Sequence, residues 1–432
     1  MVKIIIPKTK RKIAQKRVFS KTHSPDILKK VMKSPYNRIL PSLRLVEMPS
    51  YAFGQLDEIK MELVQKGQQL IDLSLGSPDH PTHPQVLEAL NKGMQKLRNQ
   101  QYPIFSGLPS FKEACSQWFK QRFNVQLDPK TNILPLNGSK EGIAHIAFAY
   151  MQEGFLTIIP SPYYPVHMRG TVLAGGNVYE MKLKPENGYV ADLDSIPEDI
   201  LVRAKIMIIS YPHNPTGAVV DKAYLQKAVN ICKEYNILLI NDFAYSEIWF
   251  DNNRPHSILE VRGGMDVAIE FHTFSKTYNM AGMRLGFAVG NPEIIQTLYK
   301  LKTNIDYGVC MGIQEAGIAA IELGDQYRES IRLEYQNRRN YVFTKLHEMG
   351  FDVMNPGGAM YTWIPIPERF KVANKNSFDF ALEVLRETGV ALVPGLTFGR
   401  HGEDFVRLAF VQNLERTQLA MERLGNYICS KV

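Results

Sequence analysis

A lysine flanked by hydroxyl groups lies in a polar turn that follows the apolar run Val267–Phe271. The lysine is Lys276, and the hydroxyl side chains around it are Thr273, Ser275 and Thr277. Arg284 follows eight residues later, between two glycines and just before a second apolar run. An amine can condense with an aldehyde, and hydroxyls together with a guanidinium can hold a phosphate. The spacing therefore indicates a covalent amine anchor beside an anion site.

An aldehyde and a phosphate on one small molecule describe pyridoxal 5'-phosphate (PLP), which becomes the candidate cofactor. The alternative is a surface turn whose cations are simply solvated. Short motifs produce many false matches, so this stretch alone does not decide between the two.

A second candidate phosphate site lies in NGSKEGIAH, residues 137–145, where Ser139 and Lys140 stand at the start of an expected helix. Free backbone N–H groups and the helix dipole attract anions at such a position. The alternative is plain capping of the helix by these residues.

Further polar residues follow apolar runs. Asn214 lies in YPHNPTG, which also suits an ordinary β-to-α turn. Asp242 ends the run ILLIND, and a carboxylate there is costly unless it is paired, for example with a protonated pyridine nitrogen; a helix N-cap is the alternative. Arg407 interrupts the strand-like FVRLAF and would bind a carboxylate of a substrate or of an Asp. Tyr164 could stack on an aromatic ring or pack in the core.

The order of these motifs resembles that of the class I/II aminotransferases, which are fold-type I PLP enzymes. The motifs are GSK, PxPxYP, NPTG, DxAY, SK with an arginine eight residues on, and a late strand arginine, within about Leu45 to Leu424. The resemblance implies a PLP-dependent transaminase that moves an amino group between an L-amino acid and a 2-oxo acid, and that acts as a homodimer with shared active sites.

The resemblance also implies a role for each residue. Lys276 would form the Schiff base and then act as the general base, and Asp242 would pair with the pyridine nitrogen. The implied phosphate ligands are Ser139, Lys140, Thr273, Ser275 and Arg284, with Tyr102 reaching the phosphate of the neighbouring subunit. Asn214 and Tyr245 would bind the ring hydroxyl oxygen, and Tyr164 would stack on the ring. Arg407 would clamp the substrate carboxylate, with Gly76 against it and Asn214 nearby.

Substrate identity is predicted from three segments. VAIEFHTFSKTYNMAG, LKTNIDYG and GAMYTW resemble bacterial glutamate–pyruvate (alanine) transaminases, whereas GSKEGIAH is shared with LL-diaminopimelate aminotransferases. The first specificity is therefore expected, and an LL-diaminopimelate aminotransferase or a PLP-dependent lyase is the alternative. Asn304 stands where aspartate aminotransferases place an arginine, which disfavours aspartate. Met283 replaces the aromatic residue usual before the arginine.

The elements that must position these residues alternate along the middle of the chain. Strands are expected at Ile133–Leu136, Phe155–Ile159, Lys205–Ser210, Ile237–Asn241, Val267–Phe271 and Leu285–Val289, and helices at Glu141–Met151, Tyr164–Leu173, Lys222–Tyr235 and Glu293–Leu301. Apolar runs alternating with helices predict an α/β fold whose mostly parallel sheet is covered on both faces. Ligands bind beyond the carboxyl ends of such strands, where the polar residues above are placed.

The pattern changes after about Gly312. A long helix toward Gly350 is expected, followed by strands at Phe351–Met354, Ala359–Pro365, Val390–Val393 and Phe405–Phe410, with helices between and after them. This predicts a smaller α+β domain. The expected organisation is a basic arm at 1–44, an N-terminal part of the small domain at 45–80, a large PLP-binding domain at 81–311, and the rest of the small domain at 312–432.

Composition limits the remaining function classes. Residues 1–44 hold 13 basic residues and one acid, a net charge of +12, against −4 for the rest of the chain. The arm is expected to be a solvated tail that binds no nucleic acid, and it is too short for the DNA-binding domain of a PLP-sensing regulator. No apolar run approaches the ~20 residues of a membrane helix. Neither GxGxxG nor GxxxxGK[ST] is present, which disfavours a nucleotide-binding protein. The four cysteines lack CxxC spacing, which predicts a cytoplasmic protein without a thiolate metal site.

Overall fold

The computed structural model describes residues 41–46, 48, 52–371 and 376–430. The chain divides into two units, residues 1–50 and residues 51–432. In the first unit the described residues include one short helix, α3 (Leu43–Val46). Most of the predicted basic arm lies outside the described residues. No helix among the described residues is both long enough and apolar enough to span a bilayer.

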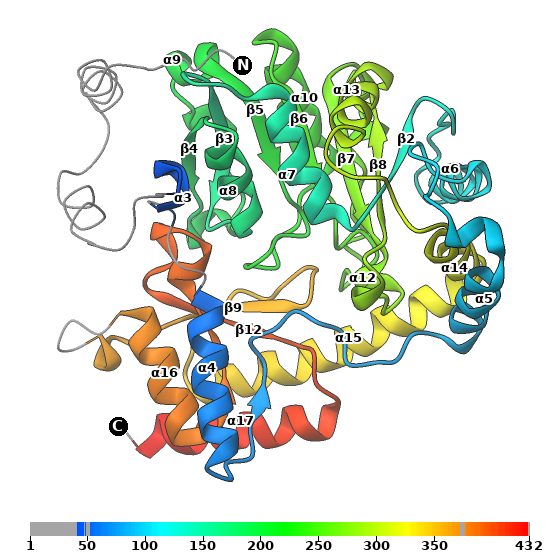
Figure 1. Cartoon of the computed structure of the whole chain (residues 1–432). Helices are drawn as coiled ribbons and strands as arrows, with labels where there is room; N and C mark the ends of the chain where they lie inside the picture. The colour runs from blue at the N-terminus through cyan, green and yellow to red at the C-terminus, as the bar shows by residue number, and fades with distance from the viewer. Residues whose placement is uncertain (1–40, 47, 49–51, 372–375, 431–432) are drawn as a thin grey trace, which may run out of the picture. The chain divides into compact units, whose positions relative to one another are not determined.

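A seven-stranded sheet forms the centre of the second unit, with the order β2-β8-β7-β6-β5-β3-β4 (Figure 1). The strands are β2 (Ile133–Leu136), β3 (Leu156–Ser161), β4 (Asn177–Lys182), β5 (Ala204–Ile209), β6 (Leu238–Asp242), β7 (Ala268–Thr273) and β8 (Gly286–Gly290). The strands β4, β3, β5, β6 and β7 pair in parallel, and β8 is antiparallel to both of its neighbours. The prediction of a mostly parallel sheet is therefore confirmed.

Helices cover both faces of this sheet because side chains alternate along each strand. Leu238 and Ile240 of β6 pack into one core, and Leu239 between them packs into another. The first core also takes residues from α7 (Ser139–Tyr150), α8 (Pro165–Leu173) and α13 (Pro292–Lys302). The second takes residues from α6 (Pro109–Phe123), α10 (Lys222–Glu234) and α14 (Met311–Glu322). The predicted helices of this region are confirmed to within a few residues.

The C-terminal elements build a separate core. A three-stranded antiparallel sheet, in the order β11-β12-β9, consists of β9 (Tyr361–Pro365), β11 (Val393–Pro394) and β12 (Phe405–Ala409). The helices α16 (Ser377–Thr388) and α17 (Leu414–Ser430) pack with it, and β1 (Ile71–Asp72) pairs with β10 (Val390–Ala391). Ile71 and Leu73 belong to this core. The boundaries at 44, 80 and 311 stay predictions.

Three further helices join or precede these parts. The long helix α15 (Gly324–Glu348) runs from beside α14 into the C-terminal core (Figure 1). The helix α14 ends at Glu322 and α15 begins at Gly324, which has φ +76°, where one continuous helix was expected. The helices α4 (Ala52–Gln65) and α5 (Pro84–Gln95) precede the sheet in sequence.

The predicted strand at Phe351–Met354 is wrong, and strand β4 was missed. Phe351 and Val353 are buried in the C-terminal core, but their backbone is irregular. Buried apolar residues alternate here as they do in a strand, but the segment is not paired with any strand that the structure describes. The alternation alone therefore led to a wrong prediction. The β4 sequence NVYEMK mixes polar and apolar residues because β4 lies at the edge of the sheet and is only partly buried.

Candidate active site

A cavity of about 330 Å³ lies where several sheet strands end. Asp242 is the last residue of β6, Thr273 is the last residue of β7, and Ser139 opens α7 directly after β2. The cavity brings together all predicted site residues except Tyr102: Gly76, Ser139, Lys140, Tyr164, Asn214, Asp242, Tyr245, Thr273, Ser275, Lys276, Arg284 and Arg407. The rule that ligands bind at the carboxyl ends of parallel strands therefore predicted the part of this cluster that follows the sheet strands, whereas Gly76, Arg284 and Arg407 were expected from the resemblance.

One end of the cavity is suited to an anion. The first turn of α7 has no side-chain cap, so its backbone N–H groups remain available to a ligand. Gly138, with φ +84°, precedes that turn, and a Cβ added there would lie 2.4 Å from Nη2 of Arg284. The glycine therefore lets the guanidinium approach the helix terminus. Arg284 has a left-handed backbone, φ +55°, which is uncommon for a residue with a side chain. Burial, with Arg169 and Arg284 nearby, lowers the pKa of Lys140.

Lys276 lies on the single helical turn α12 (Phe274–Thr277), directly after β7. The Oγ1 atom of Thr273 caps that turn by accepting from the backbone N–H of Ser275. The Nζ atom of Lys276 donates to the backbone oxygen of Gly76. Burial, and then the positive charges of Arg407 and Arg284, lower the pKa of Lys276 to about 8. A larger share of this amine than of an ordinary lysine is therefore neutral and nucleophilic near neutral pH.

Asp242 is buried and has only one of its two oxygens satisfied. Oδ2 is 3.0 Å from Nε2 of His167, which lies on α8 and is fully buried. Oδ1 has no hydrogen-bond partner among the described residues. A buried carboxylate oxygen without a partner is costly, so this atom is placed to accept from a ligand N–H.

Arg407 is buried and also lines the cavity. Its Nη1 donates to Oδ1 of Asn214 at 2.9 Å, and its Nη2 donates to the backbone oxygen of Ser74 at 2.6 Å. Its Nε has no partner among the described residues. The guanidinium carbon lies 4.1 Å from the ring centre of Tyr361 and 4.7 Å from that of Phe398. The arginine is thus held rigidly and keeps a donor for a carboxylate.

The sequence did not single out His167 or Tyr361. Tyr361 lines the cavity, and its hydroxyl lies 2.7 Å from that of Tyr245. Other lining residues that were not predicted are Asp57, Leu75, Ala244 and Ala281. A usable signal existed for His167, because it stands three residues after Tyr164, at helical spacing.

These residues fit three of the polar groups of PLP. Cations and an uncapped helix terminus suit the phosphate, a lysine of low pKa suits the aldehyde, and the unpaired Oδ1 of Asp242 suits a protonated ring nitrogen. Such a site, at the strand ends of a mostly parallel sheet with a second α+β core, defines a PLP-dependent enzyme of the aminotransferase type.

The chain belongs to the class I and II aminotransferases, whose family model matches residues 68–424. It is therefore a PLP-dependent transaminase acting on amino acid and 2-oxo acid substrates, and the prediction of cofactor and reaction class is confirmed.

Its relatives include LL-diaminopimelate aminotransferases. That of Aquifex aeolicus is 42% identical over 383 residues, covering 89% of this chain and 98% of the relative. That of Syntrophobacter fumaroxidans is 42% identical, covering 88% and 97%. Among solved structures, substrate-bound BacF from Bacillus subtilis matches with a TM-score of 0.86 and 33% identity, covering 90% and 98%. A probable N-succinyldiaminopimelate aminotransferase from Thermus thermophilus matches with a TM-score of 0.82 and 31% identity, covering 87% and 99%.

Tyr102 is the one predicted site residue outside the cavity. It lies between the short 3-10 helix η1 (Leu97–Gln100) and α6, and 75% of it is exposed. Its ring stacks on Tyr307 at 4.5 Å between ring centres. Within a single chain it has no place at the proposed phosphate site.

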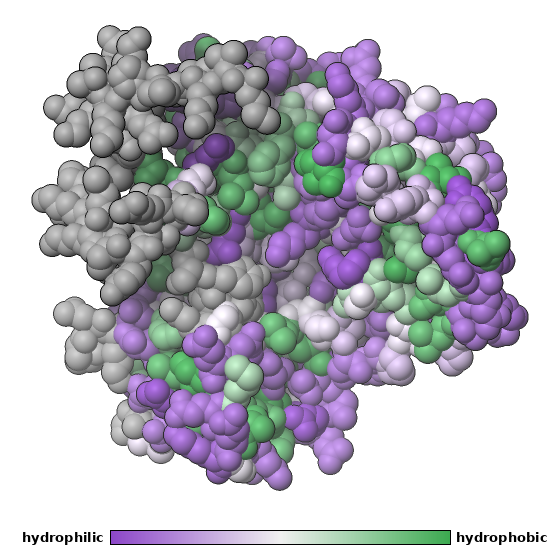
Figure 2. Space-filling view, in the orientation of Figure 1, coloured by the Kyte–Doolittle hydropathy of each residue, from purple (hydrophilic) through white to green (hydrophobic). Residues whose placement is uncertain are grey.

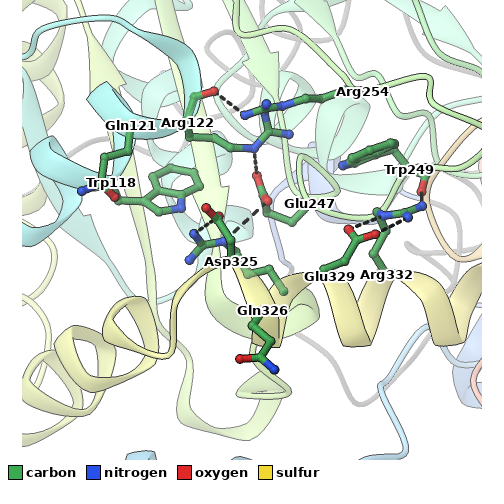
Figure 3. A pocket seen from close by; sticks show the side chains of 11 residues that line it. Trp118, Gln121, Arg122, Glu247, Trp249, Arg254, Asp325, Gln326, Glu329 and Arg332 are labelled. Atoms are coloured by element: carbon green, nitrogen blue, oxygen red, sulfur yellow. Dashed lines mark hydrogen bonds and ion pairs between the residues drawn. The ribbon is translucent and has the colours of Figure 1, made fainter.

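A second cavity, of about 480 Å³, lies between α6, the segment after β6, and the first turns of α15 (Figure 3). Its four arginines already donate to carboxylates or backbone oxygens. Arg122 bonds Glu247 at 2.7 Å, Arg332 bonds Glu329, Arg328 bonds Asp325, and Arg254 bonds the backbone oxygen of Arg122. Charge in this cavity is thus largely internally paired, and we assign it a structural role in joining these elements.

Proposed function

We propose that the chain transaminates LL-diaminopimelate. The supporting observation is that relatives with this name are about 42% identical to it over nearly their whole length. The glutamate–pyruvate specificity expected from three sequence segments is less well supported than this alternative. The signal in GSKEGIAH, shared with LL-diaminopimelate aminotransferases, was the more informative one. The family match also favours transamination over the lyase alternative.

The proposed chemistry assigns each side chain a task. Bound PLP supplies an aldehyde for covalent attachment and a ring that accepts electrons from the substrate Cα. Lys276 holds the cofactor covalently, and when the substrate amine replaces it, its free Nζ moves the proton from Cα. Asp242, oriented by His167, keeps the ring nitrogen protonated. Asn214 and Tyr245 bind the ring hydroxyl oxygen, and Tyr164 stacks on the ring.

The anion sites fix the orientation of both molecules. Ser139, Lys140, Thr273, Ser275 and Arg284 hold the phosphate with the amide groups of α7. Arg407 binds the α-carboxylate of the substrate, with Gly76 close by and Asn214 linking the arginine to the cofactor end of the site. With both anions fixed, the Cα–H bond of the substrate would face Lys276, which lines the same cavity.

The active site is proposed to need two chains. Tyr102 would bind the phosphate of the partner's site, which accounts for its exposure. Exposed apolar side chains lie on and near α5, including Leu87, Met94 and Leu97, and Figure 2 shows apolar patches over the region of α5 and α14. An exposed apolar face of this kind supports a homodimer in which the second chain would cover it. A cytoplasmic location, expected from the separated cysteines, also remains a proposal.

The test is a donor screen with purified holoenzyme. LL-diaminopimelate, L-glutamate and L-alanine are added singly while the cofactor absorbance is followed, and a panel of 2-oxo acids is then supplied. We expect the highest kcat/KM with LL-diaminopimelate. A higher value for L-glutamate with pyruvate would instead support the glutamate–pyruvate reading, and turnover without any oxo acid would support a lyase.

A further inference from the structure

Tyr361, in the segment GAMYTW, is the first residue of β9 and makes three contacts inside the active-site cavity. It is 2% exposed and touches Tyr245, Arg407 and Gly76. Its backbone is fixed by pairing of β9 with β12, where Tyr361 lies opposite Ala409 and Arg407 lies two residues away. The ring therefore has little freedom to leave the cavity.

The first contact is a hydrogen bond between two buried hydroxyls, Oη of Tyr361 and Oη of Tyr245, at 2.7 Å. Burial, and then the neighbouring Tyr361, raise the pKa of Tyr245 well above its usual range, so Tyr245 keeps its proton. A tyrosine hydroxyl has one proton to donate and can also accept. When Tyr361 donates to Tyr245, the proton of Tyr245 is left for a second acceptor in the cavity. Chained hydrogen bonds of this kind strengthen each other.

The second contact is with the guanidinium of Arg407. The carbon of that group lies 4.1 Å from the ring centre of Tyr361 and 4.7 Å from that of Phe398. A guanidinium that contacts aromatic rings through its face keeps the N–H groups in its plane for hydrogen bonds. Two edge positions are taken by Asn214 and Ser74, and Nε is still without a partner. The ring contacts thus leave Nε, the remaining donor, in the plane of the guanidinium group. Bidentate binding of a carboxylate requires donors in that plane.

The third contact explains a glycine. A Cβ at Gly76 would lie 1.9 Å from Oη of Tyr361, so no larger residue leaves room for the hydroxyl. The backbone oxygen of the same Gly76 accepts from Nζ of Lys276. The position of Tyr361 is therefore coupled to the segment that contacts the lysine.

We propose that Tyr361 is a positioning residue that acts through two others. Its hydroxyl turns the proton of Tyr245 toward the ring oxygen of the cofactor, and its ring holds Arg407 edge-on to the carboxylate of the substrate. This inference rests on the roles proposed above for Tyr245 and Arg407.

Two substitutions separate the two actions. Tyr361→Phe removes only the hydroxyl, so the ring oxygen of the cofactor receives a weaker hydrogen bond and its negative charge is less stabilised. The nitrogen of Lys276 that is bonded to the cofactor should then have a higher pKa and keep its proton to higher pH. We expect the midpoint of the pH titration of the holoenzyme absorbance to rise, and PLP to bind the apoenzyme about two- to tenfold more weakly, as loss of one hydrogen bond predicts. KM for the amino acid should change less than twofold. Tyr361→Leu also removes the ring and should raise that KM about tenfold.

The matched control is Tyr335→Phe. Tyr335 is equally buried in the same C-terminal core, and its hydroxyl has no partner among the described residues. This variant should leave the absorbance midpoint and the PLP affinity unchanged. It therefore shows whether the effect of Tyr361→Phe comes from the positioning role of Tyr361 or from the loss of any buried hydroxyl.

Tyr245→Phe distinguishes this inference from the proposed function. If Tyr245→Phe shifts the midpoint and Tyr361→Phe does not, the positioning role of Tyr361 is overturned and the role of Tyr245 stands. If neither shifts it, the role proposed for Tyr245 fails as well. A double variant whose shift equals the sum of the single shifts would also overturn the coupling, because residues acting in series should not be additive.

Discussion

At neutral pH a lysine amine with an ordinary pKa is almost fully protonated and has no lone pair with which to attack an aldehyde. In this cavity burial and two arginines lower the pKa of Lys276 to about 8, so roughly a tenth of the amine is neutral at pH 7. The side chain therefore suits both covalent attachment and proton transfer without a separate base.

This pKa predicts a pH profile. Covalent uptake of PLP by the apoenzyme should rise about tenfold per pH unit below 8 and level off above it, because only the neutral amine reacts. The measurement is the initial rate of the cofactor absorbance change between pH 6.5 and 9. Lys276→Ala should show no covalent uptake and should lose at least about a hundredfold in kcat, as removal of a general base predicts. A flat profile, or an alanine variant of near-normal activity, would remove Lys276 from this role.

Asp242 offers a second residue-scale prediction. Asp242→Asn keeps the shape of the side chain but removes the charge that holds a proton on the ring nitrogen. We expect PLP binding to remain measurable while kcat falls about a hundredfold or more, as for loss of a placed charge in a buried site. Asp325→Asn, in the cavity of Figure 3, is the control and should keep kcat within about twofold. An equal loss in both variants would contradict the assignment.

The site residues at strand ends could be predicted from the sequence. The residues that reach the site only through contacts distant in sequence could not. Asp242 and Lys276 were found because each follows an apolar run. His167 is 75 positions from Asp242, and Tyr361 is 116 positions from Tyr245, so neither contact leaves a local pattern. The one local signal for His167 is its helical spacing from Tyr164, and Tyr361 was noted only as part of GAMYTW, a segment compared for substrate identity.

At the scale of elements, the strands of the central sheet were predictable because a strand buried on both faces is apolar throughout. The edge strand β4 was not predicted, because its partial exposure weakens the apolar pattern of a strand. A strand was wrongly predicted at residues 351–354, because this irregular segment buries alternate residues as a strand does. The site depends mainly on the well-predicted elements. Most of the site residues could therefore be predicted from the sequence.

The junction of β2 and α7 yields an element-scale prediction. Gly138 has φ +84° and ψ 154°, a conformation nearly restricted to glycine, and its added Cβ would press on Arg284. Gly138→Ala should destabilise the fold by about 1–3 kcal/mol and weaken PLP binding by displacing the guanidinium. Thermal unfolding and PLP titration of the apoenzyme measure the two effects.

Gly154→Ala is the matched control for that strain. Gly154 has φ +90°, but its added Cβ would meet nothing within 4 Å. It should lower stability and leave PLP affinity intact. Equal PLP affinity in both variants would show that the contact of Gly138 with Arg284 has no part in holding the cofactor.

At the scale of the whole molecule, the question is why Tyr102 lies outside the cavity that holds every other predicted site residue. It is exposed and stacked on Tyr307, whose ring also contacts Phe105 at 5.4 Å between ring centres. An exposed aromatic group of this kind is costly to leave in water and suits a protein interface. A second copy of the chain, related by a two-fold axis, would place each Tyr102 at the other's site.

Mixing two inactive variants tests this arrangement. In a mixed dimer of Lys276→Ala and Tyr102→Ala chains, one shared site carries both lesions and the other carries neither. Random exchange of equal amounts makes half of all dimers mixed, so about a quarter of wild-type activity should return for a two-fold dimer. The control mixes Lys276→Ala with Asp242→Asn, two lesions that belong to a chain's own site. Each site of that mixed dimer then carries one lesion, so activity should stay at the level of the separate variants. Failure of the first mixture to recover after subunit exchange has been verified, or recovery in both mixtures, would contradict a site shared through Tyr102.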